Sequence, residues 1–314
     1  MPINQDYAQF LSSLCSSKFQ SLWPAQEYVL QSYARNYADR WNVAIELPTG
    51  AGKTLIALLV AEAWRREDKK VAILSANKTL ARQMVQEAQS LNIPVVLMEG
   101  KGSIIPSPDK RAYQRARSLA VMNYWVYFNQ NPIIDPADLL IMDDAHLAEH
   151  CLHSLYSVEI DRYLHENLFK TLITELQQRF PDYGVLADAL ADNAPESFTS
   201  VLLSFLDQGE VVNRLRQIVD ASPDLQNDTG LHFRWRRLRH QLLEANMYVS
   251  QNAIWIRPYI YPLTANPQYE QAQQCLYMSA TIGETSDLSR RLGILTHNLG
   301  YVLLHSPLAV KHPL

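Results

Sequence analysis

Short apolar segments alternate with longer segments of helical periodicity over the first half of the chain. Apolar runs of strand length occupy residues 43–47, 71–74, 94–98, 120–122 and 139–142. Helical patterns lie between them, for example over 54–64 and 79–90, and Pro24 is placed to begin a helix that runs to about residue 40. Strands that are apolar throughout and separated by helices are typical of a parallel sheet buried on both faces. The pattern therefore predicts a doubly wound α/β domain.

The alternation stops at about residue 147. Leucines then recur at helical spacing, at Leu152, Leu155, Leu164, Leu168, Leu172 and Leu176, and similar patterns cover 201–206 and 211–219. Strand character resumes at 253–256 and at 274–278. We therefore expect an α/β domain in two parts, residues 1–146 and 253–314, interrupted by an all-helical insertion over 147–252.

Charge is distributed unevenly along the chain. The 314 residues are enough for about two domains and carry a formal net charge of −4, so the protein as a whole is not basic. Residues 61–120 hold 11 Lys or Arg against 6 Asp or Glu, whereas residues 147–200 hold 3 against 9. A polyanion such as a nucleic acid is expected to lie over the first of these segments and to avoid the second.

The sequence shows no signal for a membrane or for secretion. Its longest uninterrupted apolar run, residues 55–61, is far shorter than the ~20 residues that a membrane-spanning helix requires. The first ten residues lack the basic start and the apolar stretch of a signal peptide. The cysteines, at positions 15, 151 and 275, have no CxxC spacing, which argues against a disulfide framework and a zinc ribbon. We expect a cytoplasmic protein.

A phosphate-binding loop is predicted between the first strand and the helix that follows it. Residues 46–54 read Glu-Leu-Pro-Thr-Gly-Ala-Gly-Lys-Thr. Gly50 and Gly52 allow the backbone to curl so that its N–H groups and the helix N-terminus face phosphate oxygens. Lys53 provides a cation for the β and γ phosphates, and the hydroxyl of Thr54 can coordinate Mg²⁺. A glycine-rich turn without function is the alternative, which this strand–turn–helix context disfavours.

A pair of carboxylates closes a neighbouring apolar strand. Asp143 and Asp144 directly follow the run 139–142. Asp143 is placed to hold Mg²⁺, directly or through water, and Asp144 to orient or deprotonate the attacking water. Adjacent aspartates at a strand end can also be simple turn formers, but the predicted phosphate-binding loop upstream favours the catalytic interpretation. ATP or GTP hydrolysis is therefore the working hypothesis.

Taken together, these motifs resemble those of superfamily 2 helicases with a DEAH-type box. Residues 48–54, 143–146 (Asp-Asp-Ala-His) and 279–281 (Ser-Ala-Thr) are similar to motifs I, II and III. Residues 23–26 (Trp-Pro-Ala-Gln) are similar to the upstream glutamine motif, and 77–83 (Asn-Lys-Thr-Leu-Ala-Arg-Gln) to motif Ia. Five motifs in this order make the resemblance specific. It implies a RecA-like P-loop NTPase fold that uses ATP and Mg²⁺.

Within superfamily 2 helicases, the sequence resembles the XPD/DinG-like branch. Residues 98–102 (Met-Glu-Gly-Lys-Gly), 121–124 (Val-Met-Asn-Tyr) and 292–294 (Leu-Gly-Ile) are similar to that branch. The branch also has a helical insertion between motifs II and III, called the Arch, and 132 residues separate His146 from Ser279 here. By this resemblance the chain is a first RecA-like, ATP-binding domain with an Arch-like insertion.

The resemblance implies a role for each matched residue. ATP would be bound by Gln26, Pro48, Thr49, Gly50, Ala51, Gly52, Lys53 and Thr54. Catalysis would use Lys53, Asp143 and Asp144, with Mg²⁺ held by Thr54 and Asp143. A nucleic-acid backbone, DNA rather than RNA, would contact Asn77, Lys78 and Asn123. The residues that couple the two sites would be His146, Ser279 and Thr281.

Three departures from the branch change this expectation. No cysteine lies between Cys15 and Cys151, so the iron–sulfur cluster that the branch often carries is not expected. Asp144 replaces the usual glutamate and is one methylene shorter, which alters how a water would be positioned. Nothing in the chain matches motifs IV to VI or their arginine finger. We therefore expect a second RecA-like domain to be absent or supplied as a separate domain or subunit.

The preferred function is the ATP-binding half of a nucleic-acid-dependent ATPase or helicase that couples ATP hydrolysis to movement on DNA. Asp144 and the missing second domain keep open an alternative, a non-hydrolysing ATP-dependent switch or scaffold subunit that acts with a partner. A small-molecule kinase on a P-loop fold is disfavoured, because it needs neither a Ser-Ala-Thr strand end nor motif Ia.

Two further patterns each have two interpretations. Residues 231–240 interleave cations with Phe233 and Trp235. They either track a single strand by base stacking or form an amphipathic helix with its aromatics in the core. His150 and His153 share one helix face, but no second pair of metal ligands is evident, so ordinary helix residues are favoured over a metal site.

Overall fold

The computed structural model of the protein describes residues 6–100, 104–129, 131–191, 199–203, 209–260, 263, 266–283, 285–294 and 299–303. Its contacts divide the chain into two compact units. The first consists of Met1–Cys151 together with Pro262–Leu314, and the second is Leu152–Tyr261. Each unit has its own sheet and its own hydrophobic core, so each is described by itself.

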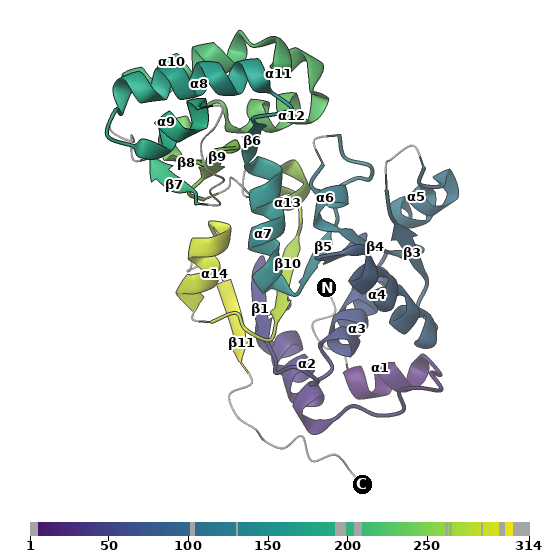
Figure 1. Ribbon diagram of the computed structural model, residues 1–314. Helices are drawn as coiled ribbons and strands as arrows, with labels where there is room; N and C mark the ends of the chain where they lie inside the picture. Colours follow the sequence, from purple (N-terminus) through teal and green to yellow (C-terminus); the bar gives the residue numbers. More distant parts are fainter. Residues whose placement is uncertain are drawn as a thin grey trace. The chain divides into compact units, whose positions relative to one another are not determined.

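A seven-stranded parallel sheet forms the centre of the first unit (Figure 1). From edge to edge its strands are β11 (Leu299–Leu303), β1 (Asn42–Glu46), β10 (Gln274–Ser279), β5 (Leu139–Asp143), β2 (Val71–Ser75), β4 (Leu119–Asn123) and β3 (Val95–Met98). Every neighbouring pair is parallel. The inner strands are buried along nearly their whole length, as a sheet covered on both faces requires.

The helices of this unit are α1 (Tyr7–Ser13), α2 (Pro24–Asn36), α3 (Lys53–Arg65), α4 (Lys78–Ser90), α5 (Ser107–Gln114), α6 (Tyr124–Tyr127), α7 (Ala145–Tyr156), α13 (Pro267–Glu270) and α14 (Thr285–Leu292). The last turns of α7 extend into the second unit. Every side chain of α3 from 55 to 64 is buried, because this helix contacts the sheet as well as α1, α2 and α4. Its one buried charge, Glu62, accepts hydrogen bonds from Arg65 at 2.7 Å and from Arg66 at 2.9 Å.

The second unit combines helices with a four-stranded antiparallel sheet. Its strands, in spatial order, are β6 (Val158–Asp161), β9 (Ala253–Pro258), β8 (Ala245–Val249) and β7 (Val201–Leu203). Its helices are α8 (Glu166–Arg179), α9 (Gly184–Leu190), α10 (Gly209–Asp220), α11 (Pro223–Asn227), α12 (Thr229–Leu238) and the 3₁₀ turn η1 (Leu242–Glu244). Apolar side chains of both kinds of element form its core. None of the helices in the described part of the chain has the length and hydropathy that a membrane crossing needs.

The predicted parallel sheet is confirmed. Each of the five apolar runs of the first half is a strand of it, and the runs 54–64 and 79–90 lie in α3 and α4. The helix that begins at Pro24 ends at Asn36, four residues earlier than expected. Residues 274–278 also lie in the parallel sheet, as predicted.

The expectation of an all-helical insertion is wrong, because residues 158–161, 201–203 and 245–249 are strands. These strands have three to five residues, and the leucine periodicity of the neighbouring helices obscured them. Residues 253–256 also do not return to the parallel sheet, since they belong to β9 and pair with β6 and β8. The residues 204–206 of a predicted helical pattern lie outside the described residues.

Candidate functional site

Three of the predicted motifs meet at the carboxyl ends of the central strands of the parallel sheet. β10 lies between β1 and β5, and the register pairs Glu46 with Ser279 and Met278 with Asp143. The strands are parallel, so their carboxyl ends lie at the same edge, which is where open α/β sheets bind their ligands. The loop after β1, the carboxylates after β5 and the Ser-Ala-Thr segment after β10 are therefore neighbours.

The predicted phosphate-binding loop connects β1 directly to α3. Gly50 and Gly52 have φ angles of +83° and +82°, in the left-handed region that glycine adopts without strain. Gly52 is the residue before α3, so the N–H groups of the first turn of the helix open towards this loop. The ammonium of Lys53 lies over the loop, 3.3 Å from the carbonyl oxygen of Leu47 and 3.5 Å from that of Pro48. This is the cradle of backbone donors and one cation that a polyphosphate fits.

Gln26 is tied to this loop by its side-chain amide. Its Nε2 donates to the carbonyl of Ala51 at 3.1 Å, and its Oε1 accepts from the backbone N–H of Trp23 at 3.0 Å. A Cβ on Gly52 would lie only 2.1 Å from that Nε2, so a side chain at position 52 would displace the Gln26 amide from its contact with Ala51. Gln26 itself is buried.

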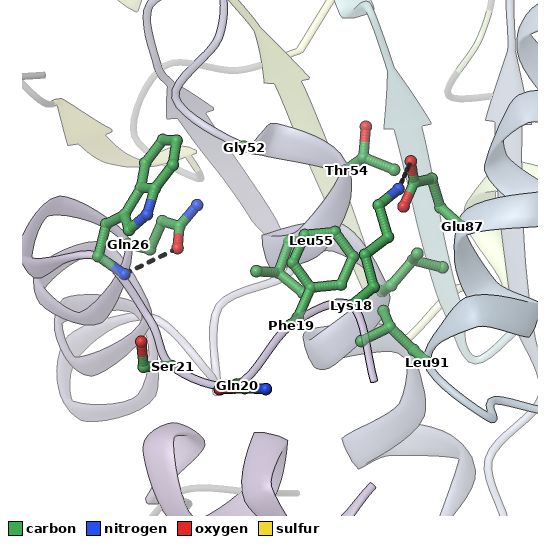
Figure 2. A pocket seen from close by; sticks show the side chains of 12 residues that line it. Lys18, Phe19, Gln20, Ser21, Gln26, Gly52, Thr54, Leu55, Glu87 and Leu91 are labelled. Atoms are coloured by element: carbon green, nitrogen blue, oxygen red, sulfur yellow. Dashed lines mark hydrogen bonds and ion pairs between the residues drawn. The ribbon is translucent and has the colours of Figure 1, made fainter. Parts of the chain in front are cut away.

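A cavity of about 480 Å³ adjoins Gln26 and the start of α3 (Figure 2). Gln26, Gly52, Thr54 and Leu55 line it on the side of the loop, and Lys18, Phe19, Trp23, Glu87 and Leu91 contribute to the rest of its lining. An ion pair between the Lys18 ammonium and the Glu87 carboxylate links the segment before α2 to α4. The volume of the cavity and its lining of aromatic and polar side chains suit a planar, polar ring.

The sequence predicted Gln26, Gly52 and Thr54 as site residues, but not the residues that line the rest of this cavity. Lys18 and Phe19 lie upstream of the glutamine motif, and Glu87 and Leu91 lie in and just after α4, far along the chain. Phe19, an aromatic residue shortly before the glutamine motif, was the one local sign in the sequence of a further cavity residue. The acidic and apolar contributions from α4 have no such signal, because only the tertiary fold brings them to the cavity.

Asp143 is the last residue of β5 and is partly buried. Burial and the neighbouring Asp144 carboxylate raise the pKa of Asp143 to about 6, against the opposing effect of the Lys53 charge. The hydroxyl of Tyr124 donates to the backbone carbonyl of Asp143 at 3.1 Å, which fixes the strand end. Asp144 has a φ of +50°, a left-handed conformation that aspartate adopts more readily than most residues.

His146 and Ser279 join the second and third motifs. The Nδ1 of His146 lies 2.8 Å from the Oγ of Ser279. The same Oγ accepts from the backbone N–H of Thr281 at 3.1 Å, and the carbonyl of Ser279 accepts from the N–H of Leu47 at 3.0 Å. Ser279 is fully buried, so these bonds replace solvent for its polar atoms. One residue thus links the helix after β5, the Ser-Ala-Thr segment and the phosphate-binding loop.

The three residues predicted to contact a nucleic-acid backbone lie at the carboxyl ends of strands β2 and β4, on the same side of the sheet as the phosphate-binding loop. Asn77 and Asn123 cap α4 and α6, with Oδ1 atoms that accept from Leu80 N–H at 3.0 Å and from Val126 N–H at 2.9 Å. Each asparagine therefore has a structural role, which the sequence analysis did not foresee. Lys78 begins α4, and its ammonium is 3.3 Å from the Glu99 carboxylate.

Glu99 binds a second cation as well. Arg82 donates to both carboxylate oxygens of Glu99, at 2.9 and 3.0 Å, and with Lys78 it lowers the pKa of that carboxyl. Glu99 belongs to the segment 98–102, of which 101 and 102 lie outside the described residues. The positive charge beside motif Ia is thus partly neutralised within the protein.

The structure favours the amphipathic-helix interpretation of the basic segment 231–240. Most of it forms α12, and Trp235 is 1% exposed, with its Nε1 donating to Asp220 at 2.8 Å. Arg239 binds the same carboxylate. Trp235 is therefore not available for base stacking.

As for metals, the described residues contain no group of three or more His, Cys, Asp or Glu side chains arranged to hold an ion.

The donors at the sheet edge fit a magnesium-bound nucleoside triphosphate. The glycine-rich turn, the Lys53 ammonium and the N-terminus of α3 suit phosphate oxygens, while the Thr54 hydroxyl and Asp143 carboxylate are hard oxygen ligands of the kind that Mg²⁺ prefers. The cavity beside Gln26 has room for a base. Both parts lie within the first unit.

The chain is similar to one protein-family model and to solved structures of XPD helicases. Residues 20–169 match the ResIII family model, described as the res subunit of type III restriction enzymes. An XPD helicase structure superposes with a TM-score of 0.52 at 16% identity, over 90% of this chain and 62% of that chain. The structure of S. tokodaii Xpd4 superposes with a TM-score of 0.51 at 15% identity, over 90% and 61%. No curated protein sequence matches the chain.

These similarities confirm the predicted fold, a RecA-like parallel sheet of the kind found in the XPD helicase structures. The chain spans about three fifths of the length of the two XPD structures. At 15 and 16% identity the structural likeness shows the fold alone.

Proposed function

We propose that the chain is the ATP-binding half of a nucleic-acid-dependent ATPase of the XPD/DinG-like helicase type, which couples ATP hydrolysis to movement on DNA. The observation that carries this proposal is the 2.8 Å contact between His146 and Ser279. It joins the two motifs that follow β5 and β10 beside a phosphate-binding loop. A phosphate site alone would fit many P-loop enzymes, whereas this link between motifs II and III is what a motor needs to relate its nucleotide site to a second site.

Each residue at the sheet edge has a proposed task. Gly50, Gly52 and Lys53 hold the phosphate groups, and Thr54 with Asp143 holds the magnesium ion. When bound, Mg·ATP supplies the phosphoryl group to be transferred and the metal charge that stabilises it. Asp143 must be ionised to serve as a ligand, and the positive charge of Lys53 favours that form.

Base recognition is proposed for the cavity beside Gln26. The Gln26 amide already contacts Trp23 and Ala51, so its orientation is fixed before a base enters. An amide presents a donor and an acceptor, which is the pair that matches the edge of adenine. Preorganisation of this kind reduces the entropy lost on binding.

Contact with nucleic acid is proposed for the start of α4. Lys78 is 60% exposed at its side chain, so its charge faces solvent although it also pairs with Glu99. Asn77 and Asn123 fix the helix starts from which backbone N–H groups can reach phosphates. The task of these two asparagines is then to shape the surface, in addition to any direct contact.

Asp144 favours a second candidate, a non-hydrolysing ATP-dependent switch or scaffold. Its φ of +50° and its shorter side chain place the carboxylate differently from a glutamate. If Asp144 cannot orient a water, ATP would bind without turnover and signal through Ser279. Asp144→Glu distinguishes the candidates, because only a switch that lost catalysis through this residue would gain hydrolysis from the change.

Calorimetry with Mg·ATP tests the main proposal. Lys53→Ala should abolish binding while leaving the fold intact, because the hydrogen bonds of the Lys53 ammonium seen in the described residues are to two carbonyl oxygens of the loop. Lys69→Ala, beyond the opposite end of α3, is the matched control and should bind as the wild type does. Unchanged ATP affinity in folded Lys53→Ala would overturn the site assignment.

A further inference from the structure

The carboxylate of Glu46 gathers several hydrogen-bond donors just outside the predicted motifs. Glu46 is the last residue of β1 and precedes the phosphate-binding loop. Its Oε2 accepts from the backbone N–H groups of Ile282 at 3.0 Å and of Gly283 at 3.1 Å. The hydroxyl of Tyr301, on β11, lies 3.0 Å from the same oxygen. Glu46 thereby connects β1 to the loop that follows the Ser-Ala-Thr segment.

Tyr301 holds the other side of that loop. Its hydroxyl lies 2.6 Å from the carbonyl oxygen of Gly283 and can donate to it or to Glu46. Burial and the carboxylate of Glu46 raise the pKa of Tyr301, so the phenol keeps its proton and remains a donor. Gly283 has a φ of +84°, and a Cβ there would lie 2.6 Å from the carboxylate of Asp287. Both polar groups of the Gly283 backbone are therefore held in a conformation that residues other than glycine rarely adopt.

Residues 279–283, the held segment, are hydrogen-bonded at both ends to residues 46 and 47, at the start of the phosphate-binding loop. At its start, the carbonyl of Ser279 accepts from the N–H of Leu47 at 3.0 Å. At its end, Ile282 and Gly283 bind Glu46, the residue directly before Leu47. Thr281 lies between these two anchors. A displacement of residues 46 and 47 must therefore move the segment, because hydrogen bonds tie it at both ends.

We propose that Glu46 is a positioning residue which, together with Tyr301, locks residues 279–283 to the strand leading into the phosphate-binding loop, so that nucleotide occupancy sets the position of Thr281. For the identity of the nucleotide this inference rests on the proposed function. The lock itself does not, since it consists of contacts within the protein. None of the motifs recognised in the sequence assigns a role to Glu46 or Tyr301.

Amide hydrogen exchange, measured residue by residue by NMR, tests the lock. Glu46→Ala removes the acceptor, and exchange at Ile282 and Gly283 should become roughly tenfold faster or more, as expected for the removal of hydrogen bonds to a charged group. Glu46→Gln keeps an oxygen in reach and should restore most of the protection. Glu270→Ala, an exposed acidic residue of α13, is the control and should change nothing. Unchanged protection at both amides in a folded Glu46→Ala protein would overturn the proposal.

A second measurement tests the response to nucleotide. In the wild type, a non-hydrolysable ATP analogue with Mg²⁺ should slow exchange at Ile282 and Gly283 further. Glu46→Ala should bind the analogue within a few-fold of the wild-type affinity but lose this response, and Glu46→Gln should recover it. A residue with a merely structural role would lower stability and affinity together, without rescue by glutamine.

The outcomes separate the two proposals. If the wild type binds the analogue but exchange at both amides does not respond, the positioning role is refuted. If the wild type does not bind the analogue, the proposed function fails, while the exchange rates without nucleotide still decide whether the lock exists. Tyr301→Phe should show an intermediate loss of protection at Gly283, because it removes one of the two groups that hold that residue.

Discussion

The side-chain Nε2 of Gln26 occupies the space that a side chain at position 52 would need, since a Cβ on Gly52 would lie 2.1 Å from it. The Gln26 amide and the phosphate-binding loop are therefore complementary in shape. Gly50, two residues earlier, has the same left-handed φ but nothing within 4 Å of its would-be Cβ. The two glycines share a left-handed backbone conformation and differ in this contact, so Gly50 serves as the comparison for Gly52.

Gly52→Ala should destabilise the protein more than Gly50→Ala does. Both changes place alanine at a positive φ, which costs about 1–2 kcal/mol, and only the first displaces Gln26 from the loop. The free energies of unfolding in denaturant give the difference, and the combination of Gly52→Ala with Gln26→Ala should recover part of it. Equal losses for the two glycines would show that the Gln26 contact is not important for stability.

The pH dependence of stability should report the partly buried carboxylate of Asp143. Its pKa of about 6 in the folded state is above the value of about 3.9 in an unfolded chain. The folded state binds this proton more tightly, so the contribution to stability is full below pH 4. As the pH rises from about 4 to about 6, this contribution to the free energy of unfolding decreases by about 2–3 kcal/mol.

Asp143→Asn should remove that loss. Denaturant unfolding without Mg²⁺ at pH 4.5 and at pH 7 measures it, and the advantage of Asp143→Asn over the wild type should grow with pH. Asp135→Asn, at an exposed position in the same unit, is the control and should follow the wild type. Parallel pH profiles for the wild type and Asp143→Asn would contradict an elevated pKa.

Glu99 should limit the affinity for single-stranded nucleic acid. Glu99→Gln releases the charges of Lys78 and Arg82, so affinity should rise and its salt dependence should steepen. Lys78→Glu should lower affinity and flatten the plot of log K against log salt by about 0.7 for each phosphate of a single strand that is no longer neutralised. Fluorescence anisotropy with a labelled oligonucleotide at several salt concentrations provides both quantities. Lys170→Glu, on α8 of the second unit, is the control, and an equal effect there would argue against a local site.

Trp235 should be a core residue of the second unit. Trp235→Ala removes a side chain that is 1% exposed and its hydrogen bond to Asp220, so unfolding of that unit should become easier by about 3–5 kcal/mol. Phe233→Ala, at a partly exposed position of the same helix, should cost less. Oligonucleotide affinity should be unchanged in folded Phe233→Ala, and a large loss there would revive the base-stacking interpretation.

By itself the sequence determined six of the seven strands of the parallel sheet, all but β11, and the phosphate-binding loop. The strands are predictable because each is a short apolar run between helical patterns, and the loop because Gly50 and Gly52 must lie where the backbone turns. Both signals are local, so neighbouring residues suffice to read them. Strands β6, β7 and β8 of the second unit were missed for the same reason, since β7, for example, has only three residues and pairs with β8 more than 40 positions later.

Only the tertiary structure decided which side chains share a site. Lys18 meets Glu87 across 69 positions and Tyr301 meets Glu46 across 255, and no spacing in the sequence indicates either contact. The positive charges of residues 61–120 likewise do not gather at one site. Arg65 ends α3 and Arg117 precedes β4, so both lie at the amino ends of the strands, whereas motif Ia lies at the carboxyl ends. Local patterns specify the elements, because they depend on backbone geometry and burial. The partners of a polar side chain depend on strand order, and that is set by the packing of the whole sheet.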